Sequence, residues 1–192
     1  MTRTHPASSR EGITLAKVLR FLSLPFCPAK FETYRAVKSF QDISIEALLA
    51  DGVEGLLIDA DGTLGPHHTR DFPESAVRHA ERMQKAGLKV AIFTNATEDR
   101  FQQFSGVPVV SQVAAKPDPE GFLKAMRDYL HLTRPQNICM IGDNYITDGG
   151  AVVAGMRFIH VEPIPGDEPW FHAFTRSLAH RLVRLHFPGV FQ

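Results

Sequence analysis

Cysteine is scarce in this chain, and no long apolar run occurs. The 192 residues include two cysteines, Cys27 and Cys139, which are far apart and belong to no CxxC pair. This excludes a disulfide framework and argues against a structural zinc site. No segment reaches the ~18 consecutive apolar residues that a membrane-spanning helix needs. With 44% apolar and 22% charged residues, the composition is that of one globular domain with appendages.

Net charge is also missing, because 21 basic side chains balance 21 acidic ones. Their distribution is uneven: residues 1–40 carry a net charge of +5 and residues 170–192 one of +3, which leaves −8 for residues 41–169. The basic ends favour an anionic surface as partner, although solvated termini explain the charge equally well. The acidic middle argues against nucleic-acid binding.

The beginning of the chain is a poor secretory signal. Residues 1–10 are basic and contain no acid, but the apolar run over 18–29 is interrupted by Arg20 and two prolines. We therefore expect a cytoplasmic protein, which the basic ends would bring to the inner face of a membrane. The alternative is a transit peptide, which would direct the protein to the mitochondrial matrix.

From residue 51 onward, short apolar runs alternate with amphipathic stretches. The pattern predicts strands at 55–59, 89–94, 107–110, 138–141 and 156–161, and helices at 73–86, 97–104, 118–130 and 148–154. Such βαβ alternation predicts a three-layer, Rossmann-like α/β fold, with a central parallel sheet of about five strands and helices on both faces. We expect this core to span 51–169, between a leader with a basic amphipathic helix (1–50) and a C-terminal basic amphipathic helix (170–192).

Acidic residues follow the first predicted strand, at the sheet edge where ligands of open parallel sheets bind. Asp59 and Asp61 end this strand, and Gly62 permits a turn that brings both carboxylates towards one point. One carboxylate can then attack as a nucleophile while the other donates and withdraws a proton. Taken alone, the pair is equally compatible with an acidic loop that caps the next element.

Further polar residues follow the other predicted strands. Thr94 and Asn95 offer a hydroxyl and an amide to an anionic oxygen, and Lys116 supplies a cation for a phosphoryl group. Asp59 and Asp143 together would make an oxygen site for Mg²⁺, and Asp148 adds a further carboxylate. Each residue alone could be solvated or cap an element, but their joint occurrence in this order favours a catalytic site.

These groups resemble the four motifs of the haloacid dehalogenase-like superfamily of phosphatases, over residues 55–161. The motifs read Asp59-x-Asp61-Gly62-Thr63-Leu64, Phe93-Thr94-Asn95, Lys116-Pro117 and Gly142-Asp143-x-x-x-Thr147-Asp148. The resemblance implies that Asp59 is a nucleophile that forms an aspartyl-phosphate, and that Asp61 is the general acid and base. It implies Asp59, Asp61, Asp143 and Asp148 as metal ligands, Thr94 and Lys116 as phosphoryl-binding residues, and Gly62, Thr63, Asn95 and Arg70 as substrate contacts.

Two departures from common family patterns stand out. Many members carry a cap domain between the motifs, but the segments 62–93 and 96–115 are too short to hold one. An open site suits a phosphate on a protein, a nucleic-acid end or a lipid headgroup, whereas a second copy in an oligomer could cover a small substrate. In addition, Gly149 and Gly150 directly follow Asp148 and weaken a helix start, where the family has an apolar residue.

The layout resembles one branch in particular, the capless, IIIA-type YqeG-like family, which includes phosphatidylglycerophosphate phosphatases. The shared features are the leader, the DxDGTL motif, the capless core and a basic C-terminal helix after a Val-x-Pro stretch. The resemblance implies that phosphatidylglycerophosphate loses its terminal phosphate, which agrees with the basic ends, since anionic lipid would attract them. The amphipathic terminal helices either lie in the membrane interface or pack on the core, which is the commoner arrangement of such helices. His67, His68 and Arg70 follow the nucleophile loop and are candidates to contact the leaving group, although a solvated pair is the more frequent arrangement for two such histidines.

Other interpretations stay open. A phosphatase of this superfamily could act on another small or macromolecular phosphomonoester. A receiver domain of signalling also combines acids, a Thr, a Lys and Mg²⁺, but its acids lie on different strands. The protein could also be a membrane-bound scaffold that keeps the fold without catalysis. The intact catalytic positions in all four motifs argue against this interpretation. P-loop and dinucleotide-binding proteins are excluded, because neither GxxxxGK[ST] nor GxGxxG occurs.

Overall fold

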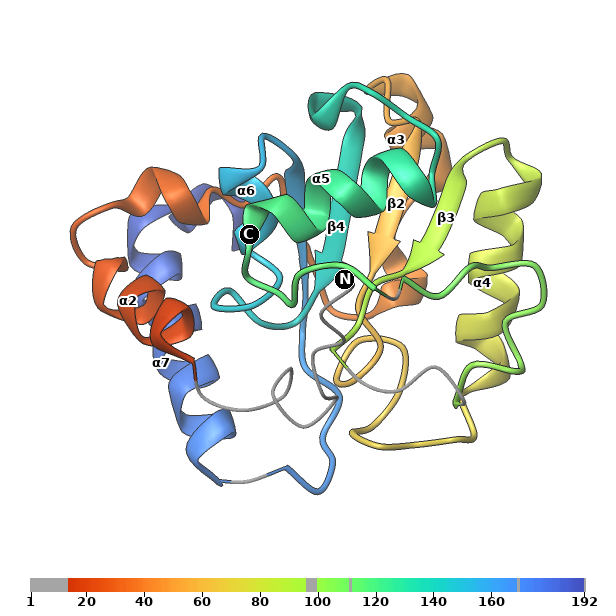
Figure 1. The fold of residues 1–192 in the computed structure, drawn as a ribbon. Helices are drawn as coiled ribbons and strands as arrows, with labels where there is room; N and C mark the ends of the chain where they lie inside the picture. Colours follow the sequence, from red (N-terminus) through yellow and green to blue (C-terminus); the bar gives the residue numbers. More distant parts are fainter. Residues whose placement is uncertain (1–13, 96–99, 111, 169, 192) are drawn as a thin grey trace, which may run out of the picture.

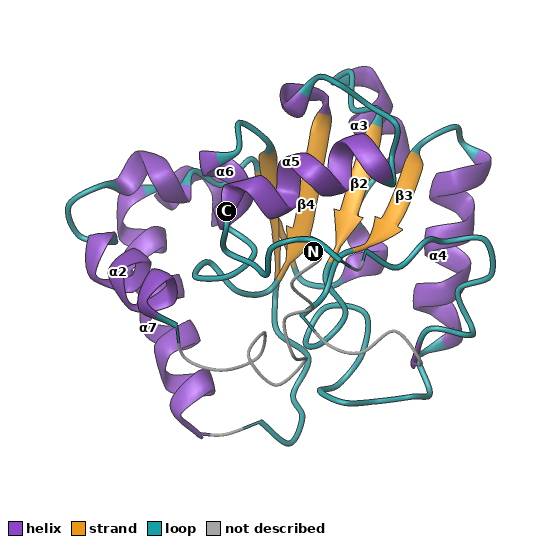
Figure 2. Cartoon of the chain, viewed as in Figure 1, coloured by secondary structure: helices purple, strands orange, loops and turns teal. Residues whose placement is uncertain are grey.

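The fold is taken from a computed structural model, which describes residues 14–95, 100–110, 112–168 and 170–191. Its centre is a wholly parallel sheet of five strands in the order β1-β5-β4-β2-β3. Helices lie on both faces of this sheet (Figure 2). This confirms the predicted three-layer α/β fold. The strands are β1 (Arg35–Val37), β2 (Gly55–Ile58), β3 (Lys89–Ile92), β4 (Ile138–Gly142) and β5 (Arg157–Val161).

Two buried apolar clusters, one on each face, hold the helices to the sheet. Leu56 and Ile58 of β2 belong to the first cluster and Leu57 to the second, as expected for a strand buried on both sides. The first cluster takes residues from α3 (Ile45–Ala50) and α4 (Glu74–Lys85). The second is covered by α2 (Leu15–Ser23), α5 (Pro119–Asp128), α6 (Gly150–Val153) and α7 (Trp170–His186).

The helices predicted at 73–86 and 118–130 are confirmed as α4 and α5. Pro73 is the N-cap of α4, and the chain turns away after this helix at Gly87, whose φ is +98°. The side chain of Asp118 caps α5 by accepting the backbone N–H of Glu120 at 3.0 Å. Short 3₁₀ turns complete the described part: Pro28–Phe31, Phe40–Asp42, Pro135–Asn137 and Pro188–Phe191.

One prediction in the middle of the chain is wrong. Residues 107–110 form no strand but a single parallel bridge between Ile92 and Val109, because Pro108 cannot donate a ladder hydrogen bond. Of the predicted helix 97–104, residues 97–99 lie outside the described residues. Arg100 is in a 3₁₀ turn, and 101–104 are not helical, with Phe101 and Phe104 buried in the first cluster.

The fifth strand of the sheet comes from an unexpected place. β1 lies within residues 1–50, which were expected to be a leader, and pairs in parallel with β5 at the sheet edge. Its three residues are only half-buried, so they show no alternation that would distinguish a strand. Residues 35–37 of this segment are therefore part of the sheet.

Both terminal helices lie at one flank of the sheet, at the opposite side of the molecule from α4 (Figure 1). α7 is anchored by buried Ala179 and Val183. α2 is anchored by Arg20, whose Nε donates to the carbonyl oxygen of Tyr145 at 3.2 Å and whose Nη2 donates to that of Lys30 at 2.9 Å. None of the helices in the described ranges is long and apolar enough to cross a membrane.

A histidine pair, of which His160 is buried and His180 half-buried, joins α7 to the sheet. Nε2 of His160 on β5 lies 3.3 Å from Nδ1 of His180 on α7, and the ring of Tyr145 stacks on His160 with centroids 4.9 Å apart. Burial, followed by the nearby His180, lowers the pKa of His160 to about 3. His160 is therefore neutral in the folded protein throughout the physiological range.

This histidine makes stability depend on pH. Below pH ~6.5 this histidine becomes protonated in the unfolded chain, whereas buried His160 in the folded protein stays neutral. The free energy of unfolding therefore decreases as the pH is lowered, until the histidine is protonated in both states. We expect His160 to account for about 2 kcal/mol of lost unfolding free energy between pH 7 and pH 5. Urea unfolding of His160→Phe should show this loss removed, whereas exposed His131→Asn should behave like the wild type. An unchanged pH slope in His160→Phe would contradict the assignment.

Candidate active site

The loop after β2 carries the acidic pair at the carboxyl edge of the sheet. The backbone N–H of Asp59 still donates to the Ile141 carbonyl of β4 at 2.8 Å, which fixes this residue as an extension of the strand. The chain then turns at Gly62, whose φ is +80°. A Cβ atom there would lie 2.5 Å from Oδ2 of Asp143. Glycine at this position therefore permits both the turn and the close approach of Asp143.

Lys116 joins two of the predicted carboxylates. Its Nζ lies 2.8 Å from Oδ1 of Asp59 and 2.5 Å from Oδ1 of Asp148. All three side chains are buried, so solvent screens these ion pairs little. The backbone N–H of Lys116 donates to Oδ1 of Asn95 at 3.1 Å. Asn95, which is expected to contact substrate, fixes the loop that carries the lysine and also lines the cleft described below.

The glycines after Asp148 have a packing reason. A Cβ atom at Gly150 would lie 2.6 Å from the carbonyl oxygen of Pro117, so glycine lets the start of α6 pack on the Lys116 loop. Oδ2 of Asp148 accepts the backbone N–H of Asn144 at 3.1 Å. The departure from the family pattern therefore helps to bring Asp148 to Lys116.

Asp59, Asp143 and Asp148 form a buried cluster in which one oxygen of each lies within 4.8 Å of the others. Burial, and then the charge of Asp148, raises the pKa of Asp59 to about 7, and burial raises that of Asp143 well above its usual range. Lys116 contacts Asp59 and Asp148 of this cluster, and one arginine, Arg176, contacts Asp143, so two cations stand against three carboxylates. Hard oxygen donors with excess negative charge fit a divalent cation such as Mg²⁺.

Arg100 holds the second carboxylate of the acidic pair. Its Nη1 and Nη2 donate to Oδ2 and Oδ1 of Asp61 at 3.0 and 2.6 Å, and the backbone N–H of His68 donates to Oδ1 at 2.8 Å. Burial raises the pKa of Asp61, but the hydrogen bonds and charge of Arg100 outweigh burial and bring it below its usual value. No sequence pattern predicted Arg100, which follows the second motif.

Helix α7 brings a second arginine to the site. Nη1 of Arg176 donates to Oδ2 of Asp143 at 2.8 Å and to Oε2 of Glu168 at 3.0 Å, while Nη2 donates to the other oxygen of Glu168. The guanidinium is buried. From the sequence, Arg176 is expected only on a polar face of its helix. No local sequence pattern indicates that α7 packs back against the carboxyl edge of the sheet.

The remaining predicted residues fall into two groups. Thr94 is buried and lines the cleft with the acidic pair, and His67 and His68 line it too. Thr63 is buried outside the cleft wall, and its hydroxyl has no hydrogen-bond partner among the described residues. Arg70 is exposed and also lies outside the wall, on a surface loop.

The site opens into a cleft of about 450 Å³. The acidic cluster and Lys116 form its polar part. The two terminal helices contribute apolar side chains, Val18, Phe21 and Leu22 from α2 and Phe171 from α7, together with as many polar ones, Lys17, His172, Thr175 and Arg176. The cleft thus places apolar surface beside a site for an anion.

Comparison with known proteins agrees with this arrangement. Residues 35–155 match the family model of the haloacid dehalogenase-like hydrolases. The chain therefore belongs to this family and is a hydrolase, as the motifs predicted. With the lysine and aspartates gathered at one sheet edge, the match supports phosphatase activity.

Individual relatives were also found. The chain is 29% identical, over 162 residues, to a Bacillus subtilis (strain 168) protein named "Probable phosphatase YqeG", covering 82% of this chain and 90% of that protein. A crystal structure of an uncharacterized protein from Listeria monocytogenes serotype 4b is 18% identical, with a TM-score of 0.46, and covers 68% of this chain and 98% of its own. A crystal structure of a haloacid dehalogenase-like protein of unknown function from Agrobacterium tumefaciens is 14% identical, with a TM-score of 0.40. The match covers 72% of this chain and 97% of that protein.

Proposed function

We propose that this protein is a Mg²⁺-dependent phosphomonoester hydrolase that acts through a phosphorylated Asp59. The observation that carries the proposal is the position of Lys116, whose Nζ contacts both Asp59 and Asp148 in a cluster that also holds Asp143. A buried ammonium group there can stabilise negative charge on a phosphoryl group that arrives at Asp59.

The reaction consists of two displacements at phosphorus. Oδ2 of Asp59, the oxygen opposite the lysine contact, attacks phosphorus and the bond to the substrate oxygen breaks. The leaving oxygen takes a proton from the protonated form of Asp61, which is the minority form beside Arg100. Asp61 then withdraws a proton from water, whose oxygen attacks phosphorus and releases the Asp59 carboxylate and inorganic phosphate. Lys116 and Thr94 orient the phosphoryl oxygens. Mg²⁺, held by Asp59, Asp143 and the Asp61 carbonyl, would reduce the repulsion between nucleophile and substrate.

Arg100 is expected to set the acid limb of the second displacement, in which Asp59 carries the phosphoryl group and does not titrate. Its guanidinium favours the carboxylate form of Asp61, which is the form needed to activate water. In Arg100→Met the pKa of Asp61 rises, so dephosphorylation lost on acidification is lost at a pH higher by roughly 1–2 units. The test is the rate of dephosphorylation of the phosphorylated enzyme against pH, in single turnovers with a soluble aryl phosphate. Arg78→Met, which removes an exposed arginine paired with Glu74, is the control. An acid limb at the same pH in Arg100→Met would contradict this role.

As substrate we propose phosphatidylglycerophosphate. The cleft supports this because apolar side chains of α2 and α7 continue from the phosphate site, where an acyl chain or glycerol backbone would lie. Among the described residues between the motifs, none forms a separate cap over the site, so the lipid need not leave its bilayer entirely. The YqeG-like resemblance of the sequence points to the same substrate.

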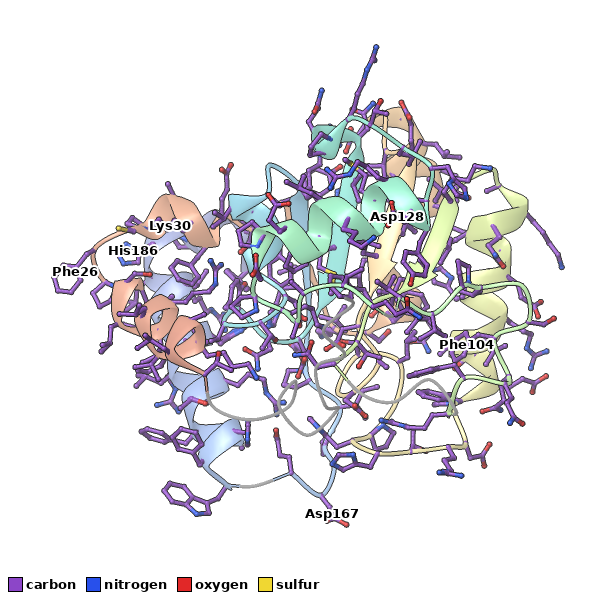
Figure 3. The ribbon with its side chains drawn as sticks, viewed as in Figure 1. Phe26, Lys30, Phe104, Asp128, Asp167 and His186 are labelled. Carbon is purple, nitrogen blue, oxygen red and sulfur yellow. The ribbon has the colours of Figure 1, made fainter. Side chains whose placement is uncertain are left out.

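We further propose that both terminal helices contact an anionic membrane. Leu15, Leu19 and Leu22 of α2 and the following Phe26 are 57–82% exposed, and Figure 3 shows Phe26 pointing away from the body of the protein. α7 adds Trp170 and Phe174, which are 80% and 58% exposed. Apolar side chains beside net basic ends are typical of helices that lie in a lipid interface.

The substrate proposal is tested by phosphate release with Mg²⁺ from a panel. The panel contains phosphatidylglycerophosphate in mixed micelles, an aryl phosphate, sugar phosphates and a phosphopeptide. We expect the highest kcat/KM for the lipid. Preference for a soluble sugar phosphate or the phosphopeptide would overturn the lipid substrate and leave the reaction class intact.

The membrane proposal is tested by sedimentation with vesicles that contain phosphatidylglycerol. Leu19→Glu and Phe26→Asp should reduce the bound fraction severalfold. Leu49→Glu is the matched control, because Leu49 is an exposed leucine on α3, which covers the other face of the sheet. Binding that is equal in all variants would contradict the proposed contact.

A further inference from the structure

Arg176 is an unusual neighbour for a carboxylate that is to hold a cation. It comes from α7, which begins beyond the last strand, and it reaches Asp143 through a bond of 2.8 Å between Nη1 and Oδ2. Both side chains are buried, with 9% and 2% of their surfaces exposed. In such surroundings the charge of the guanidinium acts on the cluster with little screening.

Arg176 also has a second acidic partner. Glu168 accepts from both Nη1, at 3.0 Å, and Nη2, so these two side chains form a bidentate pair. Asp143 accepts a hydrogen bond from only one of these two nitrogens, Nη1, which also donates to Glu168. The guanidinium can therefore give up Asp143 and remain paired with Glu168, at no loss of the bidentate contact.

We propose that Arg176 is a positioning residue that competes with the divalent cation for Asp143, and that Glu168 holds the arginine when the cation is bound. The inference rests on the proposed function, in which Asp143 is a metal ligand. Two cations that share one carboxylate repel each other, so Arg176 lowers the affinity of the site for Mg²⁺. Glu168 offsets part of this repulsion, because its negative charge neutralises the guanidinium.

The competition gives α7 a link to the metal. Whatever loosens Asp143 from Arg176 also removes one of the contacts that hold the helix to the sheet edge. By reciprocity, cation binding and this contact of α7 weaken each other by the same factor. The helix that carries exposed Trp170 and Phe174 is thus coupled to the state of the active site.

Titration calorimetry with Mg²⁺ alone tests the inference without measuring activity. Arg176→Met should bind Mg²⁺ on the order of tenfold more tightly, because the competing charge is removed and Glu168 keeps its own. Glu168→Gln should bind Mg²⁺ severalfold more weakly, because the charge of Arg176 next to Asp143 is then no longer neutralised by Glu168. Arg181→Met, which changes an exposed arginine of the same helix, should match the wild type.

The opposite directions separate competition from simple support. If Arg176 merely supported the site, both variants would bind Mg²⁺ more weakly, and this result would overturn the inference while leaving the proposed function intact. Failure of the wild-type protein to bind Mg²⁺ would overturn the inference and the proposed metal site together. Thermal unfolding checks that each variant folds, and should Arg176→Met fail to fold, tighter or unchanged binding by Glu168→Gln would by itself overturn the competition.

Discussion

Asp59→Asn is expected to abolish turnover, with kcat reduced on the order of 10⁴-fold or more, because an amide cannot replace the attacking carboxylate. Stability should be unchanged or slightly higher. Burial raises the pKa of Asp59 to about 7, which means that its charged form is costly in this position, and asparagine removes that charge. The measurement is phosphate release at saturating aryl phosphate, together with urea unfolding of the same preparation.

The combination of lost activity and retained stability is the informative result for Asp59. Asp71→Asn is the matched control, since Asp71 is exposed on the loop that follows the site, and it should leave both quantities unchanged. Turnover within tenfold of wild type in Asp59→Asn would show that another group attacks phosphorus. A large loss of stability would instead indicate a structural carboxylate.

Lys116→Met is expected to lose both activity and stability. It leaves the buried carboxylates of Asp59 and Asp148 without their shared cation, which should cost about 3–5 kcal/mol of unfolding free energy at neutral pH. We expect kcat to fall on the order of 10³-fold, because no ammonium group remains to stabilise the phosphoryl charge. Urea unfolding and phosphate release measure the two effects.

The pH dependence of Lys116→Met provides an internal check. Without the lysine the buried carboxylates have raised pKa values, so the folded state binds more protons than the unfolded state, and stability falls as pH rises through those values. The variant should therefore recover stability on acidification, relative to wild type. Lys124→Met, which breaks an exposed ion pair with Asp128, should change stability by no more than about 0.5 kcal/mol. Equal losses in the two variants would contradict the account.

The fold was predictable where the chain is buried and periodic. β2 and β4 are buried along their whole length, and α4 and α5 have caps that the sequence shows directly. β1 was not predictable, because three half-buried residues gain their strand conformation from pairing with β5. The stretch 107–110 has the composition of a strand, but Pro108 limits its pairing to one bridge.

For the site, the motifs located four residues that meet. Asp59 and Asp143 directly follow β2 and β4, neighbouring parallel strands that end at one edge, which topology alone predicts. Lys116 and Asp148 lie in the loops before α5 and α6, and only the motifs pointed to them. Arg100 and Arg176 could not be predicted in this way. Each arginine lies on a segment whose position relative to the sheet depends on tertiary packing. Their hydrogen bonds to Asp61 and Asp143 add positive charge beside the carboxylates of the cleft.

The phosphorylated intermediate can be observed directly in Asp61→Asn. An aryl leaving group needs no proton, so this variant should complete the first displacement and stall before the second, which requires the base. Incubation with ³²P-labelled aryl phosphate and Mg²⁺, followed by acid quench, should then yield close to one equivalent of hydroxylamine-labile label on the peptide that contains Asp59. No covalent label at any time, or label on another residue, while the wild type turns over under the same conditions, would contradict the account.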